Sequence, residues 1–73
     1  MSNPAASKWI PALNVGVAQT FGGGLAIGGD GKWSDSVKAV ARRHGMRMSK
    51  TTGEWYCDNN TLYSAVLADL EAA

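Results

Sequence analysis

The sequence has one cysteine, one histidine and two prolines, and these low counts limit what the chain can be. Cys57 has no second cysteine with which to form a disulfide, and His44 alone cannot complete the Cys and His cluster of a structural zinc site. No apolar run approaches the roughly 20 residues of a membrane-spanning helix, and the first residues lack the basic region of a secretory signal. We therefore expect a cytoplasmic, monomeric protein without disulfide, metal or cofactor.

Motifs for nucleotide binding and catalysis are also missing. The glycine-rich residues 21–34, FGGGLAIGGDGKWS, have Ala26 and Trp33 where a phosphate-binding loop needs glycine and Ser or Thr. The six carboxylates show no calcium-loop spacing and no convergent pair, and no spacing brings His44 to Cys57. We therefore interpret the glycines as turn residues and predict that the protein is not an enzyme.

Two segments in the first half of the chain have the pattern of strands. From Ala12 to Phe21, apolar side chains alternate with small or polar ones, which turns one face of a strand inward. A second apolar segment at 25–27 follows, and the residues GGDG at 28–31 suit a tight turn. These segments predict a first hairpin. Its inward-facing set in the first strand is Leu13, Val15, Val17 and Phe21.

A helix is expected to follow this hairpin. Ser34 or Ser36 can cap its start, apolar residues recur at helical spacing, and Gly45 suits its end. We interpret His44 as a cation at the negative end of this helix. Residues 46–57 then predict a second hairpin. Its turn is Lys50-Thr51-Thr52-Gly53, and its inward-facing set is Met46, Met48, Trp55 and Cys57.

The C-terminal residues predict a last helix. Asn59 or Asn60 can cap it, and its inward stripe is Leu62, Val66 and Leu70. The sequence thus predicts an α+β fold in the order ββαββα, with two short hairpins packed with two helices. We expect residues 9–73 to form a single domain and residues 1–8, which have little to bury, to form a mobile arm.

Charge is unevenly distributed along a chain whose formal net charge is only +1. Between Ser36 and Gly53 there are five basic residues and no acid, whereas from Glu54 onward there are four acids and no Lys or Arg. One interpretation is a solvated helix face with cations at its C-terminal end. The other is a contact surface for nucleic-acid phosphates or an acidic protein partner. The basic residues are Lys38, Arg42, Arg43, Arg47 and Lys50.

Two further features indicate a binding surface. Trp9 adjoins the expected arm and Lys8, so among the three tryptophans we predict that Trp9 is exposed and serves as an interface anchor. If the strand that contains Val15 and Val17 lies at an open sheet edge, a short peptide can pair with it by strand addition. The predicted contact residues are therefore Trp9, Val15 and Val17, together with the five basic residues.

Two segments carry a resemblance to a known family. SVKAVARRHGMRMSKTTGEWYC at 36–57 and NNTLYSAVLADLEAA at 59–73, together with the chain length, resemble the small transcription regulators of phages that infect Xanthomonas. The resemblance implies a non-catalytic protein that binds host RNA polymerase on the N-terminal segment of the β′ subunit near the RNA exit channel, with the β subunit as a further candidate. It also implies inhibition of σ-dependent initiation and promotion of antitermination, and it assigns no contact to a particular residue.

The residues alone leave three function classes open. The first is a regulator that occupies a surface of RNA polymerase, where its basic residues could also touch the backbone of nascent RNA or DNA. The second is a stand-alone nucleic-acid-binding module that uses the basic helix and hairpin, and its binding should fall steeply with salt. The third is a structural or enzyme-associated phage protein.

Overall fold

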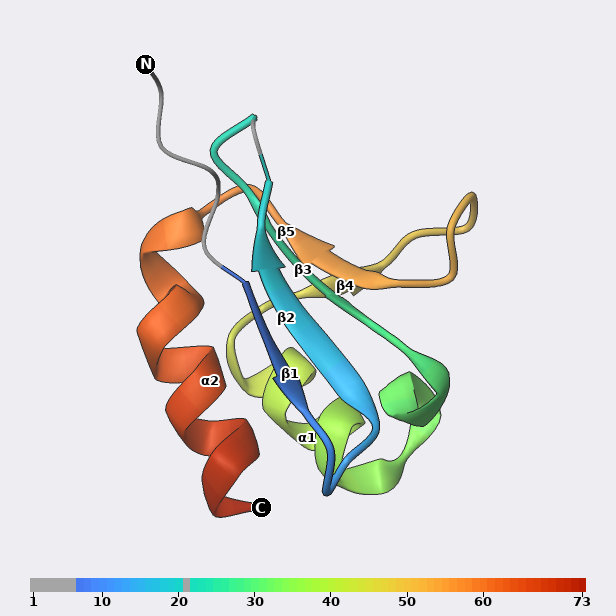
Figure 1. Ribbon diagram of the computed structural model, residues 1–73. Coiled ribbons are helices and arrows are strands. Elements are labelled where there is room, and N and C mark those ends of the chain that lie inside the picture. Colours follow the sequence, from blue (N-terminus) through green and yellow to red (C-terminus); the bar gives the residue numbers. More distant parts are fainter. Residues whose placement is uncertain (1–6, 21) are drawn as a thin grey trace.

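The computed structural model consists of a five-stranded sheet and two α-helices, and it describes residues 7–20 and 22–73 (Figure 1). The strands are β1 (Ser7–Ile10), β2 (Val15–Gln19), β3 (Leu25–Gly28), β4 (Arg47–Met48) and β5 (Trp55–Cys57). The helices are α1 (Asp35–Arg43) and α2 (Tyr63–Ala72). A short 3₁₀ helix precedes each of them, η1 (Asp30–Trp33) before α1 and η2 (Asn60–Leu62) before α2.

The sheet has the strand order β1-β2-β3-β5-β4, and each neighbouring pair is antiparallel. The predicted α+β class and both predicted hairpins are confirmed. The chain has one strand more than predicted, because Ser7–Ile10 pairs with Val15–Ala18. Ser7 and Lys8, expected in the arm, therefore belong to the sheet, and the rest of the expected arm, residues 1–6, lies outside the described residues.

A turn with one left-handed residue connects β1 to β2. Pro11 ends β1, and Asn14 has a φ of 56°, a conformation that asparagine adopts more readily than most residues. The alternation predicted for the next strand is confirmed for Val15 and Val17, which are fully buried. Leu13 lies in the turn and packs against the core, and Phe21 lies outside the described residues.

The core lies on one side of the sheet, between the strands and both helices. α1 and α2 contact each other there, and α2 also contacts β2. Because side chains alternate along a strand, the apolar set of each strand points toward these helices. The buried residues are Ile10, Val15, Val17, Leu25, Ile27, Val37, Val40, Ala41, Met46, Trp55, Val66 and Leu70.

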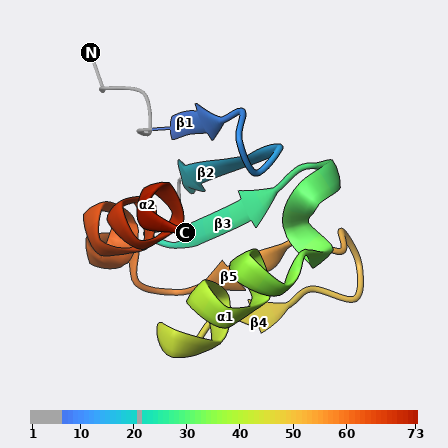
Figure 2. The same ribbon diagram turned by 90° about the horizontal axis from the view of Figure 1, so that it is seen from below.

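The opposite side of the sheet, which we call the outer face, is not covered by either helix. Figure 2 shows the strands following one another from β1 at the top to β4 at the bottom, with α2 at the left and α1 below it. The strand register sets two rows of side chains across the outer face. One row is Trp9, Gly16 and Gly28; the other is Ser7, Ala18, Ala26, Tyr56 and Arg47.

The second hairpin departs from the prediction at one residue. Met48 was expected to face the core, but its exposed fraction is 46%. The register places Met48 opposite the buried Trp55, on the inner face of the sheet. However, β4 is a two-residue strand at the edge of the sheet, and no further strand pairs with its free edge. Cys57, also expected to face inward, is half-buried and packs against the core.

The glycine-rich segment serves close packing as well as turns. Gly31 donates its N–H to the carbonyl of Asn14 at 3.0 Å, so η1 lies directly on the turn between β1 and β2. A Cβ atom at Gly31 would overlap the carbonyl oxygen of Leu13. The contact partner is backbone, which cannot move aside as a flexible side chain can. This close approach explains the glycine at position 31 by packing, without a phosphate-binding loop.

We predict that Gly31→Ala lowers the free energy of unfolding by about 1 to 3 kcal/mol, because the added methyl group overpacks the contact with the β1–β2 turn. Gly22→Ala is the matched control, since a Cβ at Gly22 meets nothing within 4 Å and its φ is not left-handed. We expect the control to stay within about 0.5 kcal/mol of wild type. Urea unfolding followed by tryptophan fluorescence measures both, and equal effects of the two variants would contradict the packing account.

Candidate functional site

The predicted basic residues lie on α1 and on the turn and strand that follow it. The predicted cap is confirmed, because the Ser34 hydroxyl accepts a backbone N–H from the first turn of α1 at 3.4 Å. The predicted stop is confirmed at Gly45, whose φ is 72°. There the N–H of Gly45 bonds to the carbonyl of Arg42, and that of Met46 bonds to the carbonyl of Ala41. A short turn at Gly45 therefore connects α1 to β4.

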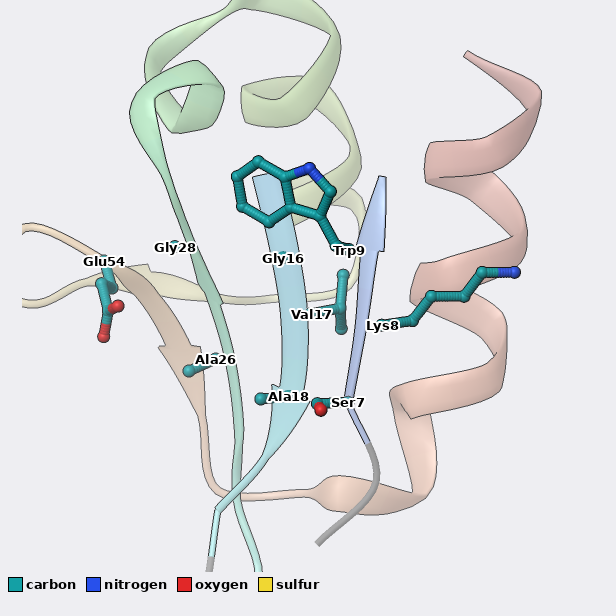
Figure 3. A pocket seen from close by; sticks show the side chains of 9 residues that line it. All are labelled: Ser7, Lys8, Trp9, Gly16, Val17, Ala18, Ala26, Gly28 and Glu54. Atoms are coloured by element: carbon teal, nitrogen blue, oxygen red, sulfur yellow. The ribbon is translucent and has the colours of Figure 1, made fainter. Parts of the chain in front are cut away.

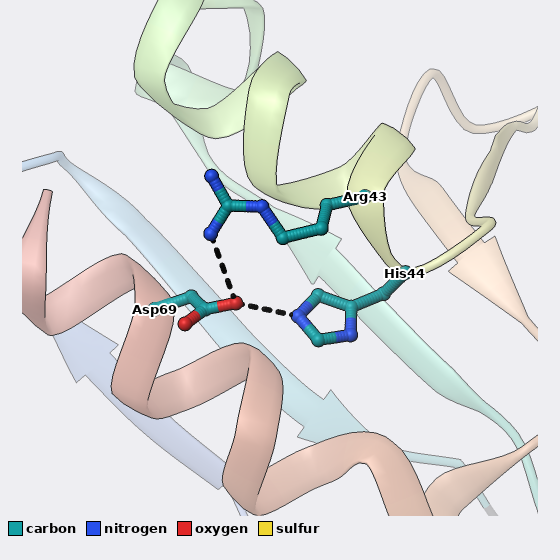
Figure 4. Close-up of polar contacts among 3 residues, drawn as sticks. All are labelled: Arg43, His44 and Asp69. Atoms are coloured by element: carbon teal, nitrogen blue, oxygen red, sulfur yellow. Dashed lines mark hydrogen bonds and ion pairs between the residues drawn. The ribbon is translucent and has the colours of Figure 1, made fainter.

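Arg43, His44 and Asp69 form a polar cluster between α1 and α2 (Figure 4). Oδ2 of Asp69 lies 2.7 Å from Nε2 of His44 and 3.3 Å from Nη1 of Arg43. Because an ionised carboxylate only accepts hydrogen bonds, Nε2 of His44 is the donor. The side chain of His44 is 15% exposed, against 63% for Arg43, so solvent screens the histidine contact less. His44 therefore links the two helices in addition to ending α1.

The electrostatics of this cluster favour the ionised carboxylate. The hydrogen bond from His44, together with the charge of Arg43, lowers the pKa of Asp69 below its ordinary value of 3.8, while partial burial opposes the shift. Asp69 lies in the C-terminal half of α2, where the helix dipole disfavours an anion. The two basic partners offset that penalty.

Lys8 and Glu71 form a second ion pair, which connects β1 to α2. Nζ of Lys8 lies 2.9 Å from Oε2 of Glu71. The hydrogen bond to Glu71 raises the pKa of Lys8 above its ordinary value of 10.5. With Asp69 also paired, both acids of α2 form ion pairs with neighbouring elements. Ion pairs within the fold therefore neutralise part of the positive charge in the middle of the sequence and part of the negative charge at its end.

Four of the five predicted basic residues keep their charges available. The ion pairs formed among the described residues leave out Lys38, Arg42, Arg47 and Lys50. Lys38 and Arg42 lie one helical turn apart on α1. Arg47 is opposite Tyr56 on the outer face, and Lys50 lies in the turn between β4 and β5. The structure thus places the charges along the helix and around the β4 edge.

The three apolar contact residues of the sequence prediction have different outcomes. Trp9 is 51% exposed on the outer face, so its predicted exposure is confirmed. Val15 and Val17 are fully buried, and their strand β2 lies between β1 and β3. The prediction of strand addition along β2 is therefore wrong, because β1, a strand that was not predicted from the sequence, already pairs with the edge of β2. The edge strands of the sheet are β1 and β4.

The part of the chain that the structure describes contains no group of three or more His, Cys, Asp or Glu side chains arranged to hold a metal ion. Among the same residues, no helix combines the length and the apolar character needed to cross a membrane. Sγ of Cys57 lies 3.6 Å from the carbonyl of Asn59, and the amide side chain of Asn59 caps η2 by accepting the N–H of Thr61 at 3.1 Å.

Comparison of the chain with protein-family models, with curated proteins and with solved structures finds no match. The assignment of a function therefore depends on the residues and on the surfaces that the fold builds from them.

We predict that Asp69→Asn lowers the thermal midpoint at neutral pH, because the variant loses the carboxylate charge that pairs with Arg43 and His44. A carboxyl group with a lowered folded pKa stabilises the protein fully above its ordinary pKa, here 3.8, and this contribution disappears as the pH falls through the folded value. The difference between wild type and variant should therefore shrink as the pH falls below about 4. Asp58→Asn, which removes an exposed acid, is the control in the same calorimetric series. A difference that does not change with pH would contradict the assignment.

Proposed function

We propose that the protein is a non-catalytic regulator that binds bacterial RNA polymerase in the host cytoplasm. The proposed contact is the N-terminal segment of the β′ subunit near the RNA exit channel, with inhibition of σ-dependent initiation and promotion of antitermination as the outcome. The resemblance of residues 36–57 and 59–73 to small phage regulators supports the choice of partner. On the structural side, the proposal is carried by four predicted basic residues that form no ion pair with any described residue: Lys38, Arg42, Arg47 and Lys50.

Binding alone is sufficient for such a role. A ligand shifts an equilibrium between two states of a large machine by its difference in affinity for them, and no chemical step is needed. A basic surface near an exit channel can also contact the phosphates of nascent RNA or of DNA, which provides a physical route to antitermination. Arg42 and its helical neighbour Lys38 are the residues that we assign to this contact.

The alternative is a stand-alone nucleic-acid-binding module. The same unpaired basic residues favour it, since phosphate contacts come from Lys and Arg side chains. The formal net charge of +1 and the ion pairs of Arg43 and Lys8 count against it, because few charges remain to release counterions. Fluorescence anisotropy with labelled duplex DNA and single-stranded RNA distinguishes the two functions. Tight, steeply salt-dependent binding by the isolated protein would favour the alternative.

The direct test of the partner is capture of polymerase by the tagged protein, first from a bacterial lysate and then with purified core enzyme. We expect the β′ subunit to be retained at moderate salt and an isolated N-terminal β′ fragment to compete for binding. Failure to retain purified core enzyme would remove RNA polymerase as the partner.

We predict that Lys38→Ala combined with Arg42→Ala weakens polymerase binding about five- to tenfold, because two charges are lost from one flank of α1. The free energy of unfolding should change by less than about 1 kcal/mol, since neither side chain forms an ion pair among the described residues. Arg43 is left unchanged because its loss would also disturb Asp69. Interferometry with immobilised core enzyme and a terminator read-through assay measure the two consequences.

The control for this variant has the same change in net charge elsewhere. Ser64→Glu combined with Ala68→Glu adds two negative charges at exposed positions of α2, also one turn apart. We expect the control to bind polymerase within about twofold of wild type at moderate salt, where distant charges are screened. Equal losses in both variants would mean that net charge, and not the α1 flank, governs the interaction.

A further inference from the structure

A shallow trench crosses the outer face between Trp9 and Glu54 (Figure 3). It is a cavity of about 400 Å³ whose floor consists of the small residues of β2 and β3. The floor residues are Gly16, Ala18, Ala26 and Gly28. Neighbouring strands lie about 4.8 Å apart, so this floor is wide enough for an extended side chain or a short segment of backbone.

The Trp9 side of the trench is aromatic and accessible. Trp9 is 51% exposed, and its register partner is Gly16. A Cβ atom at Gly16 would lie 3.1 Å from Cε3 of Trp9, so the absence of that atom lets the indole lie close to the sheet. The indole therefore has one side supported by the strand while much of its remaining surface faces solvent. Exposed indole faces attract cations through the ring quadrupole.

The opposite side of the trench carries a carboxylate. Glu54 follows the turn before β5, and a Cβ atom at Gly28 would overlap its carboxylate, which places the charge over the glycine of β3. Gly28 is the register partner of Gly16, so the carboxylate and the indole occupy adjacent positions across the sheet. No residue in the described ranges forms an ion pair with the Glu54 carboxylate. Glu54 is half-buried, and partial burial strengthens its attraction for a cation.

We propose that this trench binds the side chain of an arginine or lysine presented by an extended segment of a partner protein. The cation lies against the Trp9 indole and pairs with the Glu54 carboxylate, while the small floor residues leave room for its aliphatic stem. Charge complementarity selects this occupant over a nucleic acid, because the unpaired charge of the trench is negative. Lys8, which also borders it, is turned toward Glu71 of α2.

A basic side chain stands at the far end of the second row of the outer face. Arg47 is the register partner of Tyr56 and lies three strands away from Ala18, with Ala26 and Tyr56 between them. Arg47 repels a second cation at that end. The proposal therefore expects one basic residue in the bound segment to enter between Trp9 and Glu54, and it does not depend on the identity of the polymerase proposed above.

The test titrates ¹⁵N-labelled protein with the acetylated and amidated peptide Gly-Ser-Arg-Ser-Gly and with its citrulline counterpart, which keeps the shape and removes the charge. We expect the arginine peptide to shift the amide signals of Gly16 and Gly28 and the indole signal of Trp9. We also expect it to bind at least about fivefold more tightly than the citrulline peptide. Equal binding of the two peptides, or shifts confined to other residues, overturns the proposal.

Three variants complete the test. Glu54→Gln removes the trench charge and should weaken the arginine peptide at least about fivefold, whereas Asp58→Asn removes an acid outside the trench and should leave binding unchanged. Trp9→Leu should remove most of the preference for the arginine peptide over the citrulline peptide that does not come from Glu54. Equal losses in Glu54→Gln and Asp58→Asn would overturn the proposal, and so would shifts of the same signals on simple dilution, which would identify a second copy as the occupant. Because Glu54→Gln is nearly isosteric, the test does not depend on whether Trp9→Leu folds.

Discussion

The pairing of β3 with β5 is the interaction on which the rest of the structure depends. It places Ile27 opposite Trp55, although η1, α1 and β4 separate them along the chain. Trp55 is 6% exposed, and its indole N–H donates to the carbonyl of Lys32 at 2.8 Å, which ties η1 to β5. The ring of Trp33 packs against it at a tilt, with 6.1 Å between centroids. Without this pairing the sheet would end at β3, and the second hairpin could not extend the outer face or cover part of the core.

The sequence predicts those elements of the fold whose signals are local. Alternation identified β2, and a short apolar segment identified β3. A serine cap, at Ser34 or Ser36, and the stop at Gly45 identified the ends of α1. β1 was missed because SKWI is short, polar at its start and followed by Pro11, so its strand conformation depends on pairing with β2. The exposure of Met48 was missed for a related reason: alternation says which face a residue occupies, but not how far the helices reach across that face.

The candidate site was predictable in composition but not in pairing. The run of basic residues was correctly assigned to a helix and the hairpin after it, yet sequence distance does not show that Asp69 meets Arg43 or that Lys8 reaches Glu71, 63 residues away. Only the folded chain shows which charges remain available. The trench could not be predicted from the sequence for the same reason, because Glu54 lies close to Gly28 only when β3 pairs with β5.

The two surfaces have opposite electrostatic preferences, and this constrains how one partner could use both. The α1 flank, with Lys38 and Arg42, attracts anionic groups, while the trench beside Glu54 attracts a cation. α1 lies on the inner side of the sheet and the trench on the outer side, so a single flat surface cannot cover both. A partner that engages both has to reach around the sheet or supply two separate segments. Complementary charges at separated positions fix orientation more than they add affinity. A domain this small can therefore dock in a defined orientation with only a few strong contacts.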